Sequence, residues 1–331
     1  MKKITLLLLC SFSLYLANAQ ERVITTGVPF LMVSADARAA GMADIGIATS
    51  TDAFSQQWNP AKYAFSNHKQ GFSISYTPYL TDLVNDISLG QITYFNKINE
   101  KSTWAGSLRY FGLGNIELRN DANDQPRIVS PNELALDGSY SLKLSNTFSM
   151  AVAGRYIRSN LKVATDNTDA SAANTFAVDV AGFYQSEEKA YNHFNGIWRA
   201  GFNIQNLGPK ISYDNDEFNT NFLPANLKIG TGFDFIFDED NKLAVNLELN
   251  KLLVPTPQNP DLNGDGTVTP EEYTQNYNNY RKTGWVSGLL KSFGDAPNGF
   301  SEELKEITYA LGSEYVYKDS FAVRAGYFHE S

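Results

Sequence analysis

Cysteine is almost absent from this chain of 331 residues. The single cysteine, Cys10, lies in an apolar run that follows Lys2 and Lys3. A short basic start, an apolar run and small residues at its end are typical of a cleaved secretory signal peptide, which we assign to residues 1–19. Leu9 is too large for a lipoprotein cleavage site before Cys10. We therefore expect a mature chain with no disulfide and no lipid anchor.

Basic residues and histidine are also scarce. The chain has 27 Lys and Arg against 36 Asp and Glu, a net charge of −9 with histidine neutral, which disfavours binding to nucleic acid. No phosphate-binding loop, G-x-S-x-G or H-E-x-x-H motif occurs. The three histidines, His68, His193 and His329, are far apart and belong to no metal or nucleophile motif. The sequence therefore contains no motif that supports a catalytic site, and a site assembled only in the folded chain stays open.

Long apolar runs are missing after residue 20, so no stretch is suitable for a transmembrane helix. From residue 70 onward, apolar residues instead recur with a period of two in segments of about 10 residues, the length of a tilted membrane-spanning strand. Eleven strands are predicted in this way, over residues 72–80, 86–95, 104–113, 134–142, 148–157, 176–184, 197–207, 227–237, 243–252, 307–317 and 321–328.

The two faces of these strands differ in kind. Phe148, Met150 and Val152 point one way, and small or polar residues such as Ala151 and Arg155 point the other. A two-sheet sandwich also alternates, but its outer face would carry more charge. Large apolar side chains facing lipid and polar ones facing a lumen explain both faces. The inward polar positions include Arg109, Asp137, Arg155, Asp179 and Arg199.

The connections alternate between long and short. The long ones cover residues 79–86, 114–131, 158–174, 207–224 and 251–305. This pattern predicts an all-β fold: a transmembrane antiparallel up-and-down β-barrel over residues 70–331, in the outer membrane, with long loops at the cell surface. Eleven is an odd number for such a barrel, and GYFHES lacks a terminal aromatic strand. We expect the chain to continue by a few strands; the alternative is a miscount of one.

Residues 261–273, DLNGDGTVTPEEY, match an EF-hand calcium loop. Three prolines between residues 252 and 260 exclude an incoming helix, so only the outgoing side, through Tyr280, is expected to be helical. One loop with one helix favours a structural Ca²⁺ clasp over a sensor; the alternative is an Asx-rich turn without an ion. The expected ligands are Asp261, Asn263, Asp265, Thr267, Thr269 and Glu272, with Gly266 at the turn.

The segment ahead of the strands has a different character. Residues 30–63 are rich in glycine and alanine and have no strand period, yet they are too apolar for a free tail. We expect residues 20–69 to form a plug, or hatch, inside the lumen. The alternative is a periplasmic cap or a loosely packed arm.

This segment also carries a family resemblance. The motif ARAAGMA at 37–43 and WNPA at 58–61, with Asp52 between them, resemble the FadL-like (OmpP1/FadL/TodX) family of 14-stranded outer-membrane barrels, and within it the PorV family of the type IX secretion system. Fourteen strands would leave three beyond the eleven counted. The signature residues are Ala37, Arg38, Gly41, Met42, Asp52, Asn59, Pro60 and Ala61.

The resemblance implies a shuttle and not an enzyme. Such a protein binds the C-terminal signal domain of exported cargo at a translocon barrel (SprA/Sov-like) and delivers it to a surface attachment complex with a PorU-like sortase. The loops 114–131 and 251–305 would then contact partners, with Trp285 and Phe300 as aromatic anchors. Trp285 suits packing within its own loop equally well.

Two other functions compete with the shuttle. A FadL-type transporter of hydrophobic small molecules would use the plug as its gate, but it needs an apolar route through the lumen, and the inward positions are polar. A general diffusion porin needs an open lumen, which a plug would block.

Overall fold

The computed structural model describes residues 24–81, 86–119, 121, 124–162, 171–213 and 219–330. The expected signal peptide lies outside these residues. All eleven predicted long strands are confirmed, each within four residues of its expected limits. They are β1 Gln70–Pro78, β2 Ile87–Lys97, β3 Ser102–Leu113, β6 Asn132–Lys143, β7 Phe148–Asn160, β8 Ala173–Gln185, β10 Asn195–Leu207, β13 Asn226–Ile236, β14 Asn241–Leu252, β15 Ile307–Tyr317 and β16 Phe321–His329.

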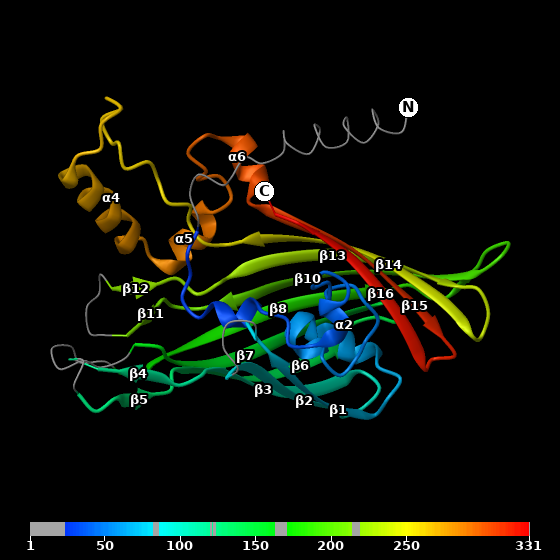
Figure 1. The fold of residues 1–331 in the computed structure, drawn as a ribbon. Helices are drawn as coiled ribbons and strands as arrows, with labels where there is room; N and C mark the ends of the chain where they lie inside the picture. Colours follow the sequence, from blue (N-terminus) through cyan, green and yellow to red (C-terminus); the bar gives the residue numbers. More distant parts are fainter. Residues whose placement is uncertain are drawn as a thin grey trace, which may run out of the picture.

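These strands form one antiparallel sheet in which each long strand pairs with the next along the chain. The two-residue strand β9 (Lys189–Ala190) pairs with β10 at its side. Figure 1 shows the sheet curving around the N-terminal segment. Because the number of long strands is odd, β1 and β16 run in the same direction, and within the described residues each pairs with one neighbour only. The sheet is therefore curved but open between β1 and β16.

The predicted facing of the strands is confirmed. On β8, the Phe176 side chain is 67% exposed on the convex face, whereas Asp179 is 1% exposed on the concave face. Arg109, Arg155 and Arg199 are likewise buried on the concave face. Alternation of this kind arises because successive side chains of a strand point to opposite faces. The convex face is thus apolar and the concave face polar.

The connections fall at two ends of the sheet. We call the end with the long connections the loop end, and the end with the short ones the turn end. The long connections hold two hairpins, β4 (Ile116–Leu118) with β5 (Arg127–Val129) and β11 (Ile211–Ser212) with β12 (Thr220–Asn221). Figure 1 shows both hairpins and α4 at the same end. The sequence did not predict these strands because two or three residues are too few to show a period.

The longest connection, between β14 and β15, carries three helices. They are α4 (Pro270–Lys282), α5 (Trp285–Lys291) and α6 (Phe300–Lys305). Thr269 and Glu272 form a capping box at the start of α4, and Pro270 occupies its first turn, so the outgoing helix begins where the sequence favours it. None of the described helices has the length and apolarity needed to cross a membrane.

The N-terminal segment, residues 24–66, lies on the concave face of the sheet (Figure 1). It forms four short helices: η1 (Pro29–Met32), α2 (Ala37–Ala40), α3 (Ser55–Trp58) and η2 (Pro60–Phe65). The Asp36 carboxylate caps α2 by accepting a hydrogen bond from the Ala39 N–H at 2.7 Å. Asn59 caps η2 in the same way through Ala61 N–H at 3.0 Å. Asp36 therefore fixes the start of α2, and Asn59 with Pro60 fixes the start of η2.

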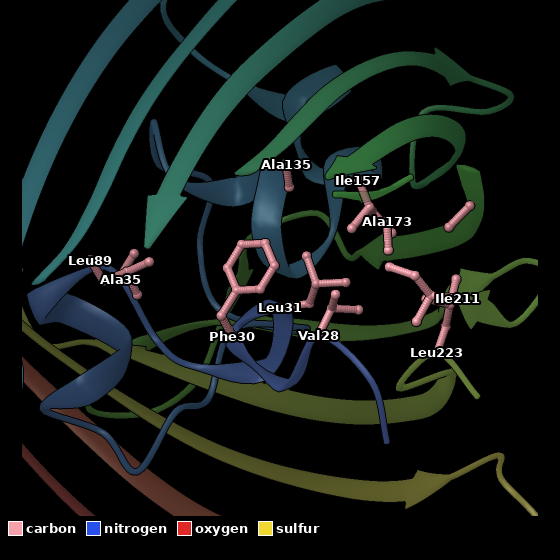
Figure 2. Packing of buried hydrophobic residues seen from close by; sticks show 11 residues of the cluster. Val28, Phe30, Leu31, Ala35, Leu89, Ala135, Ile157, Ala173, Ile211 and Leu223 are labelled. Carbon is pink, nitrogen blue, oxygen red and sulfur yellow. The ribbon is translucent and has the colours of Figure 1, made fainter. Parts of the chain in front are cut away.

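The largest apolar core lies between this segment and the sheet. Figure 2 shows Val28, Phe30 and Leu31 packed against side chains such as Ile157 and Ile211. Phe30 also stacks on Phe111, with ring centroids 6.3 Å apart. The hydrophobic core therefore fills the inside of the curved sheet and sits toward the loop end.

Candidate functional site

An ion-pair network joins the N-terminal segment to the last two strands. One guanidinium nitrogen of Arg38 lies 2.7 Å from Asp52 Oδ2, and the other lies 2.7 Å from Glu314 Oε2 on β15. Arg324 on β16 contacts the same Glu314 carboxylate at 2.6 Å. Ser50 adds its carbonyl and hydroxyl oxygens as acceptors for Arg38. The signature residues Arg38 and Asp52 are thus brought together and tied to the sheet.

A buried tryptophan lies at the centre of the segment. The Trp58 indole N–H donates to Asp36 Oδ2 at 2.7 Å, and the Lys228 ammonium lies 4.7 Å from the indole centroid. A side chain at Gly46 would overlap the indole, so this position requires glycine. The Glu248 carboxylate on β14 accepts hydrogen bonds from Gly46 N–H and Ile47 N–H. The backbone at Gly46 and Ile47 therefore lies between the Trp58 indole and the Glu248 carboxylate.

The signature Asn59-Pro60-Ala61 contacts the wall formed by β7, β8 and β10. The Asn59 amide donates to Ile47 O at 3.1 Å and to Gly182 O on β8 at 3.0 Å. Ser149 Oγ on β7 donates to the Ala61 carbonyl at 2.7 Å. These contacts give hydrogen-bond partners to the carbonyls of Ile47, Gly182 and Ala61 and tie the start of η2 to β7 and β8.

The other signature residues pack toward β15 and β16. Met42 is buried, and a Cβ at Gly312 would lie 3.0 Å from the Met42 Cβ and carbonyl oxygen. Gly41 ends α2, and a Cβ there would lie 3.4 Å from Arg324. Ala37 begins α2. The signature therefore marks where the segment approaches the sheet most closely.

Charged groups on the wall also hold the segment. Arg109 on β3 donates to the carbonyls of Phe30 and Leu31, at 3.1 Å and 3.0 Å. Arg199 on β10 donates to Ala48 O at 2.9 Å and pairs with Asp234. Each guanidinium supplies several donors in a fixed plane, which suits exposed carbonyls of an irregular segment.

A second buried network lies within the wall itself. Arg155 on β7 pairs with Asp137 on β6 at 2.7 Å and with Asp179 on β8 at 3.0 Å. Its guanidinium also donates to Asn206 Oδ1. A hollow of about 10 Å³ beside Arg109, Asp137 and Arg155 has room for about one water molecule. This part of the lumen is filled by side chains.

Several charged residues on the concave face were not singled out from the sequence. Glu248, Glu314 and Asp234 occupy inward positions of their strands, so the same alternation that indicated Arg155 could have found them. Lys62 is different: its ammonium is fully buried and donates to Gly46 O at 2.7 Å and Thr49 Oγ1 at 3.0 Å. A lone lysine in an apolar segment gives no such signal.

The EF-hand-like loop lies at the loop end, on the surface, ahead of α4. Asp261 accepts from Gly264 N–H at 2.8 Å and Gly266 N–H at 2.9 Å, and Asp265 accepts from Thr267 N–H at 2.8 Å. Gly266 adopts φ 82°, the left-handed conformation that the sharp turn requires. Residues 253–260 contain no helix, as their prolines predicted.

The donors of this loop fit calcium in kind. Among the described residues, no three His, Cys, Asp or Glu side chains converge to hold a metal ion. The Glu272 carboxylate instead accepts from Thr269 N–H at 3.0 Å, and this hydrogen bond lowers the pKa of Glu272. Carboxylate, amide and carbonyl oxygens are the ligands that Ca²⁺ prefers, and the loop residues named above are the ones that would hold it.

The helical connection is anchored at its base and exposed at its top. Lys251 on β14 pairs with Glu303 at 2.6 Å and Glu306 at 2.9 Å. Trp285 is half-buried in the first turn of α5, whereas Phe300 is 76% exposed at the start of α6. Of the two proposed aromatic anchors, Phe300 is therefore the more exposed. Other exposed apolar residues on α5, α6 and the turn between them are Val286, Leu290, Phe293 and Leu304.

A hollow of about 720 Å³ opens beside α4 and α5. Its lining includes Thr256, Tyr280, Leu290 and Asp295. Burial raises the pKa of Tyr280 to about 12. The longest connection thus offers a concave, partly apolar surface at the loop end.

Comparison with known proteins identifies the family. The model of the family described as type IX secretion system protein PorV matches residues 16–259, which is more than half of the chain and includes every signature residue. The EF-hand-like loop and α4, α5 and α6 follow the matched residues. A search of curated proteins found no match. The coverage by the family model establishes that the chain belongs to the PorV family of type IX secretion system proteins.

Proposed function

We propose that this protein is an outer-membrane shuttle of the type IX secretion system. In this proposal it binds the C-terminal signal domain of exported cargo at the translocon barrel and passes it to the surface attachment complex. Family membership supports a role in type IX secretion and suggests the outer membrane. An apolar convex face with a polar concave face suits a sheet that spans a lipid bilayer.

The observation that carries the proposal is the filled lumen. Residues 24–66 occupy the concave face, and buried arginines bind their carbonyl groups. We propose that this segment acts as a plug. A FadL-type transporter needs an apolar passage, and a porin needs an open one; buried ion pairs such as Arg155 with Asp179 favour neither. The working surface is then outside the lumen.

The loop end supplies that surface. Connections with exposed apolar side chains gather there, and large exposed apolar patches mark interaction sites on proteins. Phe300 and the neighbouring apolar side chains of α5 and α6 are the proposed contacts for the translocon, the cargo signal domain or the attachment complex. Aromatic residues that become fully covered are the usual anchors of such contacts.

Deletion of the gene that encodes this protein tests the proposal. We expect type IX cargo to accumulate inside the cell envelope of the deletion strain, and the native chain to restore its surface attachment. Fractionation and immunoblotting of cargo measure this. Secretion of cargo at normal levels together with impaired lipid uptake would contradict the shuttle and support a transporter.

Two phenylalanine variants refine that test. Phe300→Ala removes an exposed ring at the loop end, and Phe321→Ala removes one that is 62% exposed at the turn end. We expect only Phe300→Ala to reduce recovery of partner proteins with the purified chain. Equal recovery with both variants would exclude Phe300 as an anchor.

We also propose that residues 261–272 bind calcium as a clasp that orders the longest connection. Such extracellular sites have Kd values on the order of 10⁻⁴ to 10⁻³ M. A bound ion would offset part of the entropy lost when a connection of this length is ordered. The complete set of donors and the Gly266 conformation support the proposal.

Limited proteolysis tests the clasp. We expect the native connection to resist cleavage in calcium and to be cut between residues 251 and 305 in a chelator. The variant Asp261→Ala, Asp265→Ala, Glu272→Gln should be cut under both conditions, because glutamine keeps the helix cap but not the charge. Asp238→Ala, in the turn after β13, is the control. Cleavage of the native protein at the same rate in calcium and in chelator would contradict the proposed clasp.

A further inference from the structure

The N-terminal segment crosses the inside of the sheet once, from one end to the other. At the loop end, Gly27 N–H donates to Phe222 O, just after β12, at 2.8 Å. At the turn end, Lys97 at the end of β2 donates its ammonium to Ser66 O at 2.9 Å. The Lys143 ammonium, at the end of β6, lies 4.8 Å from the Phe65 ring centroid. The first and last residues of the segment therefore lie at opposite ends.

The position of β1 fixes where this segment ends but not where it begins. Since β1 begins at the turn end, residues near Ser66 must lie there. A plug that folded back on itself would bring residue 24 to the same end. The apolar core prevents this, because Val28, Phe30 and Leu31 pack against Ile211 and neighbouring side chains near the loop end (Figure 2).

We propose that residues 24–26 are displayed on the cell-surface side of the outer membrane. The proposal rests on the orientation given above, in which the loop end faces outward. Thr25 is exposed, whereas Gly27 and Val28 are buried directly after it. The chain thus enters the core at Gly27, and residues 24–26 lie outside it.

Contacts connect this entry point to the largest loop. A Cβ at Gly27 would lie 2.6 Å from the Ile211 side chain, so the segment lies tightly against the β11–β12 hairpin. That hairpin in turn holds α4: Arg281 donates to Thr220 O, and the rings of Phe222 and Tyr280 lie 5.6 Å apart. Gly27, the hairpin and α4 therefore lie next to one another at the loop end.

Cysteine labelling in intact cells tests the proposal. The variants are Thr25→Cys, Gln275→Cys on α4 and Ser320→Cys in the turn between β15 and β16, all exposed positions. The unsubstituted protein, whose only cysteine is Cys10, controls for the leader. The reagent is a maleimide on a polyethylene glycol chain too large to pass porins, so that a gel shift reports exposure.

We expect Thr25→Cys and Gln275→Cys to shift in intact cells, and Ser320→Cys to shift only after permeabilisation. If Gln275→Cys shifts in intact cells while Thr25→Cys shifts only after permeabilisation or denaturation, the inference is wrong. If Ser320→Cys shifts and Gln275→Cys does not, the proposed orientation is wrong. Ile24→Cys supplies a second position should Thr25→Cys not fold.

Discussion

Arg155→Met should lower the free energy of unfolding by about 3–5 kcal/mol, because it leaves the Asp137 and Asp179 carboxylates buried without their partner. The side chains of Arg155, Asp137 and Asp179 are all less than a tenth exposed. Two buried negative charges side by side are costly without a cation between them. Urea unfolding of the protein in lipid vesicles, followed by gel mobility with and without heating, measures the loss.

Two further variants identify the cause of that loss. Adding Asp137→Asn and Asp179→Asn to Arg155→Met removes the stranded charges and should recover part of the stability, since the amide oxygen introduced at position 179 can still accept from the Asn206 N–H. Lys242→Met breaks the exposed pair with Asp319 and should cost about 1 kcal/mol or less. A loss as large for Lys242→Met as for Arg155→Met would contradict the account of the wall network.

Trp58→Ala should cost about 3–5 kcal/mol and loosen the N-terminal segment. It removes a buried indole, its hydrogen bond to Asp36 and its contact with the Lys228 ammonium. The cavity would open at the centre of residues 24–66, so we expect faster cleavage of that segment by a protease. Unfolding in urea and limited proteolysis measure the two effects.

Trp104→Ala is the matched control for Trp58→Ala. Trp104 lies on the convex face, 44% exposed, with its ring 5.4 Å from that of Tyr94. A ring contact of this kind is worth about 0.5–1.5 kcal/mol. Gly46→Ala, which pushes a methyl group toward the Trp58 indole, should destabilise the segment in the same direction as Trp58→Ala. Equal protease resistance of Trp58→Ala and Trp104→Ala would refute a structural role for the buried indole.

The long strands were predictable because the convex and concave faces of the sheet impose opposite demands on neighbouring residues. Phe176 and Asp179 differ in environment for that reason alone, and a period of two records it in the sequence. The same alternation located the inward arginines. It did not indicate which carboxylates would pair with them, because register between strands such as β6 and β7 depends on contacts along their whole length.

The N-terminal segment was harder to predict for a physical reason. Its helices of four to six residues are too short to show a period, and its shape depends on groups far away in the chain. Gly46, for example, is held by Glu248, 202 positions later. The requirement for glycine at Gly46 becomes visible only once the Trp58 indole lies against it. The signature residues indicated the family without indicating these contacts.

The central claim is that residues 24–66 fill the lumen and that the loop end is the surface that contacts partner proteins. Conductance in planar lipid bilayers tests it most directly. We expect the native protein to be electrically silent and a chain that begins at Asn59 to conduct, because the segment that carries Phe30, Arg38 and Trp58 is then missing. Steady conductance by the native protein, equal to that of the shortened chain, would contradict the claim.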